Sequence, residues 1–143
     1  MTVHLIKLAV GVESVTHLAE LQKQRVKKAR AEGRKGLRHL TRSAPRRADE
    51  VLDGGSIYWV IAGMIRARQR IVGLGQVDDD GRSYCAIGLD RTLVRVEPRA
   101  RKPFQGWRYL EAADAPPDLK GGAAATEEMP AEMAAHLKEL GLL

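Results

Sequence analysis

Apolar residues alternate with polar ones at the start of the chain and then recur at helical spacing. The alternation over 2–11 predicts a strand with Val3 and Leu5 on one face and Ile6 on the other. From 14 to 33 the spacing becomes three to four residues, which predicts a helix with Ser14 as its N-cap and Gly33 as its stop. Its thin apolar stripe consists of Val15, Leu18, Leu21 or Gln22, and Val26.

The middle of the chain reads mainly as β-structure. We expect a short strand over 37–41 and a short helix within 43–54, with Ser43 as its cap and Pro45 in its first turn. The continuously apolar run SIYWVIAG predicts a buried strand at 56–63. Two runs of β-forming residues then flank DDDG, and Asp80-Gly81 is a favoured tight-turn pair, so a hairpin is predicted there.

These elements define an α+β fold with a mostly antiparallel sheet and helices at both ends of the chain. Gly63, Gly73, Gly75 and Gly88 fall inside strand-like runs, which favours a strongly curved sheet or a small, partly closed barrel. The length suits one domain over 1–143. Within it we expect a basic helix and connector (14–47), a β core (about 55–110), and a linker with a C-terminal helix (111–143).

Composition narrows the location of the protein more than its activity. Cys85 is the single cysteine, so an internal disulfide is excluded and a reducing compartment is favoured. The N-terminus has no basic leader, and a lysine interrupts its apolar stretch, which is a poor signal peptide. The longest apolar run, 57–65, is too short to span a membrane. We therefore expect a cytoplasmic protein with no membrane partner.

Positive charge is concentrated in one segment. The chain carries a net charge of +6, but residues 23–47 alone contain four Lys, seven Arg and one Glu. Residues 111–143 contain seven acidic groups and two Lys. This asymmetry predicts a polyanionic partner, or else an intramolecular partner for the acidic tail. The residues expected to hold a phosphate backbone are Lys23, Arg25, Lys27, Lys28, Arg30, Arg34, Lys35, Arg38, Arg42, Arg46 and Arg47.

Aromatic residues are scarce, at 4% of the chain, and half of them lie in RKPFQGWRYL at 101–110. In an extended chain Trp107 and Tyr109 point to the same side, with Arg108 opposite. Such rings could stack on bases beside basic side chains, or they could simply seal one end of the sheet. The residues expected to form one binding cleft are Tyr58, Trp59, Arg66, Arg68, Gln69, Arg101, Lys102, Phe104, Gln105, Trp107, Arg108 and Tyr109.

The run MIRARQRIV forms the expected second wall of that cleft. On a strand, Arg66, Arg68 and Arg70 share one face, where three guanidinium groups repel one another unless they are solvated or paired with an anion. Gln69 would then face inward with Ile71. Because a buried amide needs hydrogen-bond partners, Gln69 is either a structural residue or part of a pocket.

Catalytic signatures are missing from the sequence. GGSIY does not match the G-x-S-x-G hydrolase elbow, and GLG at 73–75 lacks the third glycine of a dinucleotide fingerprint. The four histidines have no metal-ligand spacing, and Asp78–Asp80 suit a solvated turn better than a metal site. Cys85 could be a nucleophile only with a histidine close by, of which His39 is the best placed. We therefore assign no catalytic residue, metal or cofactor.

Two stretches carry a resemblance to a known family. GGSIYWVIAGMIRARQRIVGL and RKPFQGWRYLEAADAPPDL resemble the uncharacterised bacterial domain-of-unknown-function family 1489, from HLIKL to DAPPDL. That resemblance implies no reaction. SIYWVI with the later IVGLGQV hairpin is also similar to the PUA-like group, which includes the EVE and ASCH domains. This second similarity implies a small curved barrel with a cleft for RNA or modified bases.

The leading hypothesis is therefore a nucleic-acid-binding module, with RNA favoured, that has an Arg and aromatic cleft. One alternative is an enzyme or sensor that clamps a small anion or nucleotide with arginines. Another is an interaction module that docks an acidic protein on its basic helix. The sequence does not predict an oligomeric state.

Overall fold

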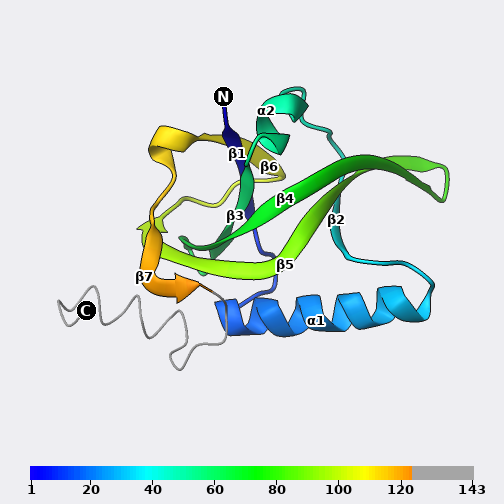
Figure 1. Cartoon of the computed structure of the whole chain (residues 1–143), viewed down its shortest axis with the longest axis horizontal. Helices are drawn as coiled ribbons and strands as arrows, with labels where there is room; N and C mark the ends of the chain where they lie inside the picture. Colours follow the sequence, from blue (N-terminus) through cyan, green and yellow to red (C-terminus); the bar gives the residue numbers. More distant parts are fainter. Residues whose placement is uncertain (124–143) are drawn as a thin grey trace.

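A computed structural model describes the backbone of residues 1–123 and the side chains up to Leu119. Within residues 1–123 the chain forms seven strands, two α-helices and one 3-10 turn (Figure 1). The predicted C-terminal helix lies outside the described residues. The elements, in chain order, are β1 (Val3–Leu8), α1 (Val15–Ala31), β2 (Leu37–Thr41), α2 (Ala48–Leu52), β3 (Ser56–Ile61), β4 (Met64–Asp79), β5 (Arg82–Ala100), β6 (Trp107–Glu111), η1 (Ala112–Asp114) and β7 (Asp118–Ala123).

All seven strands belong to one sheet, in the order β2-β5-β4-β3-β1-β6, with β7 paired to β5. Among the described strand pairs, β1–β3 is parallel and the others are antiparallel. The predicted mostly antiparallel α+β class is thereby confirmed. The Asp80-Gly81 turn is confirmed too, because both residues have positive φ (50° and 76°) between β4 and β5. Gly63 was wrongly placed inside a strand: it lies with Ala62 in the tight turn between β3 and β4.

Bulges curve the long β4–β5 hairpin. The pairing register shifts between Ile65 and Ala67, between Gln69 and Ile71, and between Ile71 and Gly73. Each extra residue bends its strand and increases the local twist, as the interior glycines predicted. The sheet curls without closing into a barrel, and β6 lies at one edge while β2 and β7 pair with β5 at the other.

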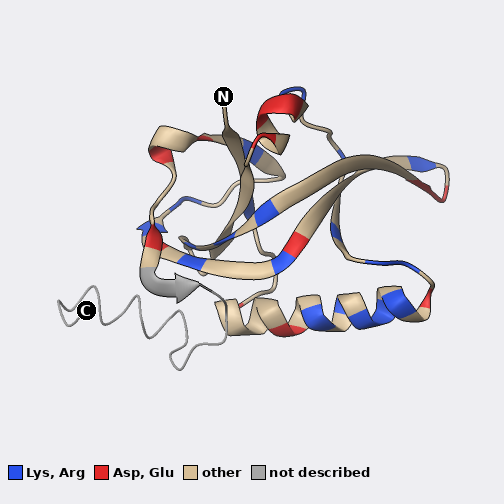
Figure 2. Cartoon of the chain, in the orientation of Figure 1, with Lys and Arg blue, Asp and Glu red and all other residues tan. Residues whose placement is uncertain are grey.

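Helix α1 begins and ends where the sequence predicts. The Ser14 hydroxyl accepts a hydrogen bond from the His17 backbone N–H at 2.9 Å, and Gly33 follows the last turn with a φ of +81°. The helix packs one mainly apolar stripe against the sheet. Its Lys and Arg, blue in Figure 2, lie in its second half. The buried stripe comprises Val15, Leu18, Gln22, Val26 and Ala29.

Helix α2 is shorter than the sequence predicts. It begins at Ala48 with Arg47 as its N-cap, so Ser43 and Pro45 lie before it instead of inside it. The physical reason is that the Ser43 carbonyl is used elsewhere. It accepts hydrogen bonds from the Thr41 hydroxyl at 3.0 Å and from the Trp107 indole N–H at 2.9 Å.

The sheet is buried on both faces. Strand β3 is buried at every position, as its uninterrupted apolar run predicts. One face packs α1 against residues such as Leu5, Ile57 and Trp59. The opposite face holds a smaller cluster around Ile6, Tyr58, Val60, Ile65, Val96 and Leu110. Among the described residues, no helix is long and apolar enough to cross a membrane.

Candidate nucleic-acid interface

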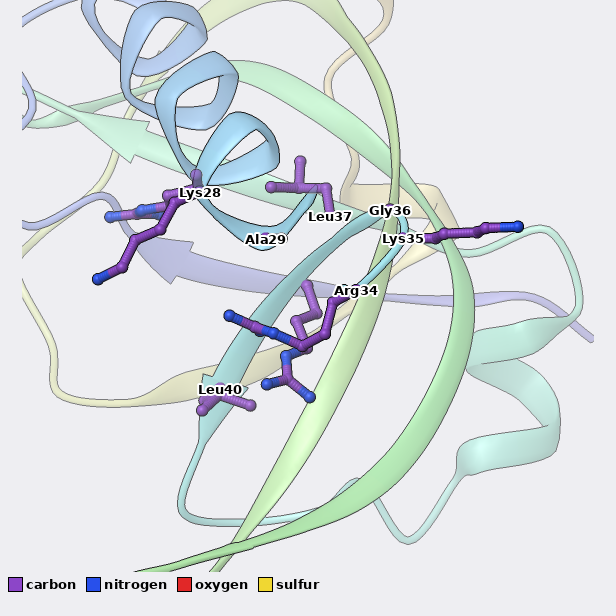
Figure 3. Close-up of a pocket in the computed structure, with 9 residues that line it drawn as sticks. Lys28, Ala29, Arg34, Lys35, Gly36, Leu37 and Leu40 are labelled. Carbon is purple, nitrogen blue, oxygen red and sulfur yellow. The ribbon is translucent and has the colours of Figure 1, made fainter. Parts of the chain in front are cut away.

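The C-terminal end of α1 and strand β2 enclose a strongly basic hollow of about 450 Å³. Lys28 comes from the helix, Arg34 from the turn that follows it, and Leu37 and Leu40 from β2 (Figure 3). Lys35 points away from Lys28 and Arg34 in that view. The cations that line this hollow are Arg25, Lys28, Arg34, Lys35 and Arg38.

A second hollow, of about 720 Å³, adjoins the first, since Leu40 lines both. One wall is the connector from Thr41 to Arg46, and the other is the Gln105–Tyr109 segment. The cations that line it are Lys7, Arg42, Arg46 and Arg108. We call the nine cations of the two hollows the basic tract.

The basic tract is mostly unpaired within the described part of the chain. There, only Arg34 of the nine forms an ion pair, at 2.5 Å from the Glu32 carboxylate. Arg108 donates only to backbone carbonyls, those of Gln105 and Trp107. Clustered cations without counter-charges create a positive potential that attracts anions. The exposed Lys23, Lys27 and Arg30 lie on the same helix but outside both hollows.

Trp107 and Tyr109 bridge the two edges of the curled sheet. The Trp107 indole N–H donates to the Ser43 carbonyl at 2.9 Å, and the Tyr109 hydroxyl accepts from the Arg47 backbone N–H at 3.1 Å. The two rings meet edge to face with centroids 4.9 Å apart. As predicted, they share one side of β6, and both are half-buried. They therefore close the gap between β6 and the segment after β2 while also lining the second hollow.

His39 lies near two cations of the basic tract, Lys7 and Arg25, and their charges affect its pKa. Its ring lies against Trp59, edge to face, at a centroid distance of 5.3 Å. Burial, together with the charges of Lys7 and Arg25, lowers the pKa of His39 to about 4. Burial also lowers the pKa of Lys7. A histidine with a pKa of about 4 is neutral at pH 7, so His39 adds no charge to the tract.

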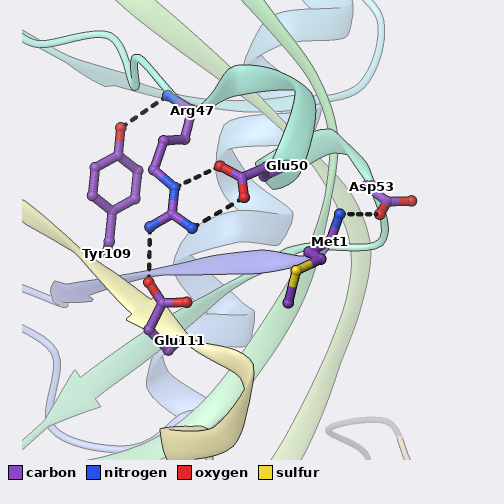
Figure 4. A network of polar contacts seen from close by, with 6 residues as sticks. All are labelled: Met1, Arg47, Glu50, Asp53, Tyr109 and Glu111. Atoms are coloured by element: carbon purple, nitrogen blue, oxygen red, sulfur yellow. Dashed lines mark hydrogen bonds and ion pairs between the residues drawn. The ribbon is translucent and has the colours of Figure 1, made fainter.

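Arg47 does not belong to the tract, contrary to the sequence prediction. Its guanidinium binds both Glu50 (2.6 Å) and Glu111 (2.8 Å), and it lies 5.2 Å from the Tyr109 ring centroid (Figure 4). The paired carboxylates raise the pKa of Arg47. Because its donors are already used, Arg47 fastens α2 to β6 and is not available to a phosphate.

The predicted second wall of the cleft is also wrong, because Trp59 and Gln69 are buried. Trp59 is 3% exposed and Gln69 is fully buried. The Gln69 carbonyl accepts from the Trp59 indole (3.1 Å) and from the Gln22 amide (2.9 Å). Its own amide donates to Gln22 (2.8 Å) and to the Asp90 carbonyl (2.7 Å). Of the two roles that the sequence allows for Gln69, a structural residue or part of a pocket, the structure shows the first.

The three arginines of β4 do not share one exposed face. The bulge between Ile65 and Ala67 breaks the alternation at Arg66, which is buried and donates to the Ile61 carbonyl at 3.0 Å. Arg68 is held in a bidentate pair by Asp118, and Arg70 is exposed. Tyr58, opposite Arg68, lies in the smaller core cluster on the other side of the sheet from α1.

RKPFQGWRYL is itself divided between two sides. Phe104 packs on the smaller core, with the Arg101 and Arg108 guanidinium groups over its ring at 5.4 and 5.8 Å. Arg101 and Lys102 line neither hollow. Gln105, Trp107, Arg108 and Tyr109 line the second hollow. The structure therefore brings part of the predicted cleft together, opposite the 41–46 connector instead of β4.

Sequence reasoning missed Lys7 as a site residue. Lys7 pairs with Trp107 across β1 and β6 and lines the second hollow. A lysine that interrupts an apolar strand was the available signal.

Cys85 has no activating neighbour among the described residues. Burial raises the pKa of its thiol, and a hydrogen bond with Thr41 opposes that rise only in part. His39 is neutral and makes no hydrogen bond to Cys85, so the pair is not a nucleophile and base. In the described part of the chain no group of His, Cys, Asp and Glu side chains is arranged to hold a metal ion.

Fold and site together define a class: a curled, open α+β sheet protein with a basic tract along one edge. Residues 5–143 match the family described as protein of unknown function, DUF1489, and the chain belongs to that family. No curated protein and no solved structure matches the chain.

Proposed function

We propose that the protein binds nucleic acid, with RNA favoured, through the basic tract. The observation that carries the proposal is the alignment of nine cations over two adjoining hollows, eight of them without an ion pair to a described residue. Phosphate-backbone binding requires clustered Lys and Arg on one surface and no fixed order. The tract meets that requirement.

The half-buried rings support a role for single strands. Trp107 and Tyr109 line the second hollow beside Arg42 and Arg46, so a base that enters it meets aromatic surface next to phosphate-binding groups. The similarity to PUA-like domains implies a small curved barrel with a cleft for RNA, and the curled but open sheet with its hollows is compatible with the cleft alone. We include that relationship in the proposal.

The alternative of an arginine clamp has less support. It relied on Arg66, Arg68, Gln69 and Arg108, and these residues face different surroundings. The remaining alternative, docking of an acidic protein on the basic helix, shares Arg25 and Lys28 with the tract. Only a direct comparison of ligands separates these two.

A pair of charge-matched variants tests the proposal. Arg38→Gln/Arg42→Gln removes two tract cations, whereas Arg82→Gln/Arg91→Gln removes two exposed cations that line neither hollow. We expect the tract variant to weaken binding of a fluorescent single-stranded RNA about tenfold or more, and the control by less than threefold. Single-stranded DNA and poly-glutamate serve as competitors.

Equal weakening by the two variants would refute the tract as the interface. Displacement of RNA by poly-glutamate at equal charge concentration would favour an acidic protein partner instead. Displacement by DNA as readily as by unlabelled RNA would remove the preference for RNA.

A further inference from the structure

A third hollow, of about 470 Å³, lies outside the basic tract and is mainly polar. It is formed where β1, β3 and β4 meet the turn before β7. The polar side chains that line it are His4, Ser56, Tyr58, Arg68, Arg70 and Asp118.

His4 presents an N–H donor to this hollow. Its Nδ1 accepts the Ser56 backbone N–H at 3.0 Å, so that nitrogen carries no proton. Burial and the charge of Arg68 lower the pKa of His4, which keeps the ring neutral at pH 7. In a neutral imidazole whose Nδ1 accepts, Nε2 carries the proton. His4 is therefore fixed as a donor through Nε2.

Tyr58 supplies the second donor, because its ring belongs to the smaller core cluster while the residue also lines the hollow. The residue is 4% exposed and its ring packs against His4, with centroids 5.1 Å apart. Its hydroxyl makes no hydrogen bond to any other residue in the described part of the chain, although it lines the hollow. A hydroxyl that lines a hollow and has no partner among the described residues is free to donate a hydrogen bond to a ligand there.

The charged groups leave a positive balance. The two carboxylate oxygens of Asp118 are both occupied by Arg68, at 2.6 and 2.8 Å. Arg68 also donates to the Ser56 hydroxyl at 3.2 Å. Arg70 is exposed and has no ion pair with a described residue. The hollow thus offers donors, and its one carboxylate is neutralised by the bidentate pair with Arg68.

We propose that this hollow is a second ligand site, which binds a phosphate monoester through Tyr58, Arg70 and Nε2 of His4. A phosphate brings several strong acceptor oxygens and the negative charge that offsets Arg70. The same chemistry is carried by a small phosphorylated metabolite and by the 5′-phosphate at the end of an RNA strand. The site shares no lining residue with the basic tract, so it does not depend on the function proposed for the tract.

Inorganic phosphate at constant ionic strength is the first probe, followed by NMR of the Gly54 and Ser56 amides. We expect saturable shifts of these amides. Tyr58→Phe removes an oxygen that has no partner in the described protein, so the fold stays intact while affinity falls about fivefold. Arg70→Gln should weaken binding about tenfold. The matched controls, Tyr84→Phe and Arg82→Gln, lie on the β5 hairpin arm and should bind as the wild type does.

Two further experiments distinguish the metabolite from the RNA 5′-phosphate, and the third hollow from the basic tract. A 5′-phosphorylated RNA that shifts the same amides more strongly than its 5′-hydroxyl counterpart identifies a strand end, and equal behaviour identifies a free metabolite. Arg38→Gln/Arg42→Gln should leave phosphate affinity at Gly54 and Ser56 unchanged. Linear, unsaturated shifts, or wild-type affinity in Tyr58→Phe and Arg70→Gln, would overturn the site.

Discussion

Replacement of Gln69 by leucine should destabilise the protein more than any single surface change. Gln69 is fully buried between α1 and the sheet, and its side-chain amide makes four hydrogen bonds. The Gln69→Leu side chain is similar in size, so the cavity term is small. The cost comes from the groups that lose a hydrogen bond to Gln69 in the core. These are the Gln22 amide, the Trp59 indole N–H and the Asp90 carbonyl.

Each of these orphaned groups costs on the order of 1–3 kcal/mol. We therefore expect Gln69→Leu to lower the free energy of unfolding by about 4 kcal/mol. Gln22→Leu should cost less, about 2 kcal/mol, because Gln69 keeps its bonds to Trp59 and Asp90. In the double variant both glutamine amides are absent, so neither one is left without the hydrogen bonds that it makes to the other. It should be more stable than the sum of the single effects by at least about 1 kcal/mol.

Urea unfolding, followed by circular dichroism, measures all three variants. The midpoint should fall while the slope m stays the same, since the native surface is unchanged. Loss of less than about 1 kcal/mol in Gln69→Leu would refute the reasoning. Strict additivity in the double variant would do so as well.

Three further predictions concern single side chains. His39 should titrate near pH 4 by NMR. Because the native state binds its proton more weakly than the unfolded chain does, His39 should contribute a fall in stability of about 3 kcal/mol between pH 6.5 and 4, and His39→Phe should remove that contribution. Cys85 should react with a thiol reagent roughly tenfold or more slowly in the native protein than in urea, and equal rates would show that the thiol is accessible. Trp107→Phe keeps the ring but loses the bond to the Ser43 carbonyl, so stability should fall by about 1 kcal/mol and amide exchange at 42–44 should speed up; unchanged exchange would contradict the bridging role.

Local signals were sufficient for most of the fold. The Ser14 cap, the Asp80-Gly81 turn and the apolar run of β3 each depend on neighbouring residues, and the structure confirms all three. The prediction of a helix that begins at Ser43 was wrong for a non-local reason. Its expected cap, Ser43, is bound by Trp107, which lies far along the chain. No spacing rule contains that contact.

The candidate site was likewise predictable where it depends on local sequence and unpredictable where it depends on long-range contacts. The charges of 23–47 are a matter of composition, and most of them line or flank the two hollows. The second wall of the cleft depended on strand alternation through Arg66, and one bulge at Ile65–Ala67 cancels it. Arg68 was lost to a carboxylate 50 residues away, and Arg47 to Glu50, three residues on, together with Glu111, 64 residues on. Charge location was predictable, whereas charge pairing required the tertiary structure.

The salt dependence of RNA affinity tests the central proposal most directly. If about six tract cations contact phosphates, the logarithm of the association constant should fall with the logarithm of salt concentration at a slope of about −4 for a single strand. Affinity should then drop about 300-fold between 50 and 200 mM salt. Arg38→Gln/Arg42→Gln should make the slope shallower by about 1.4, while Arg82→Gln/Arg91→Gln should not change it. A wild-type slope near zero, or the same slope in both variants, would contradict the assignment of this tract as the interface.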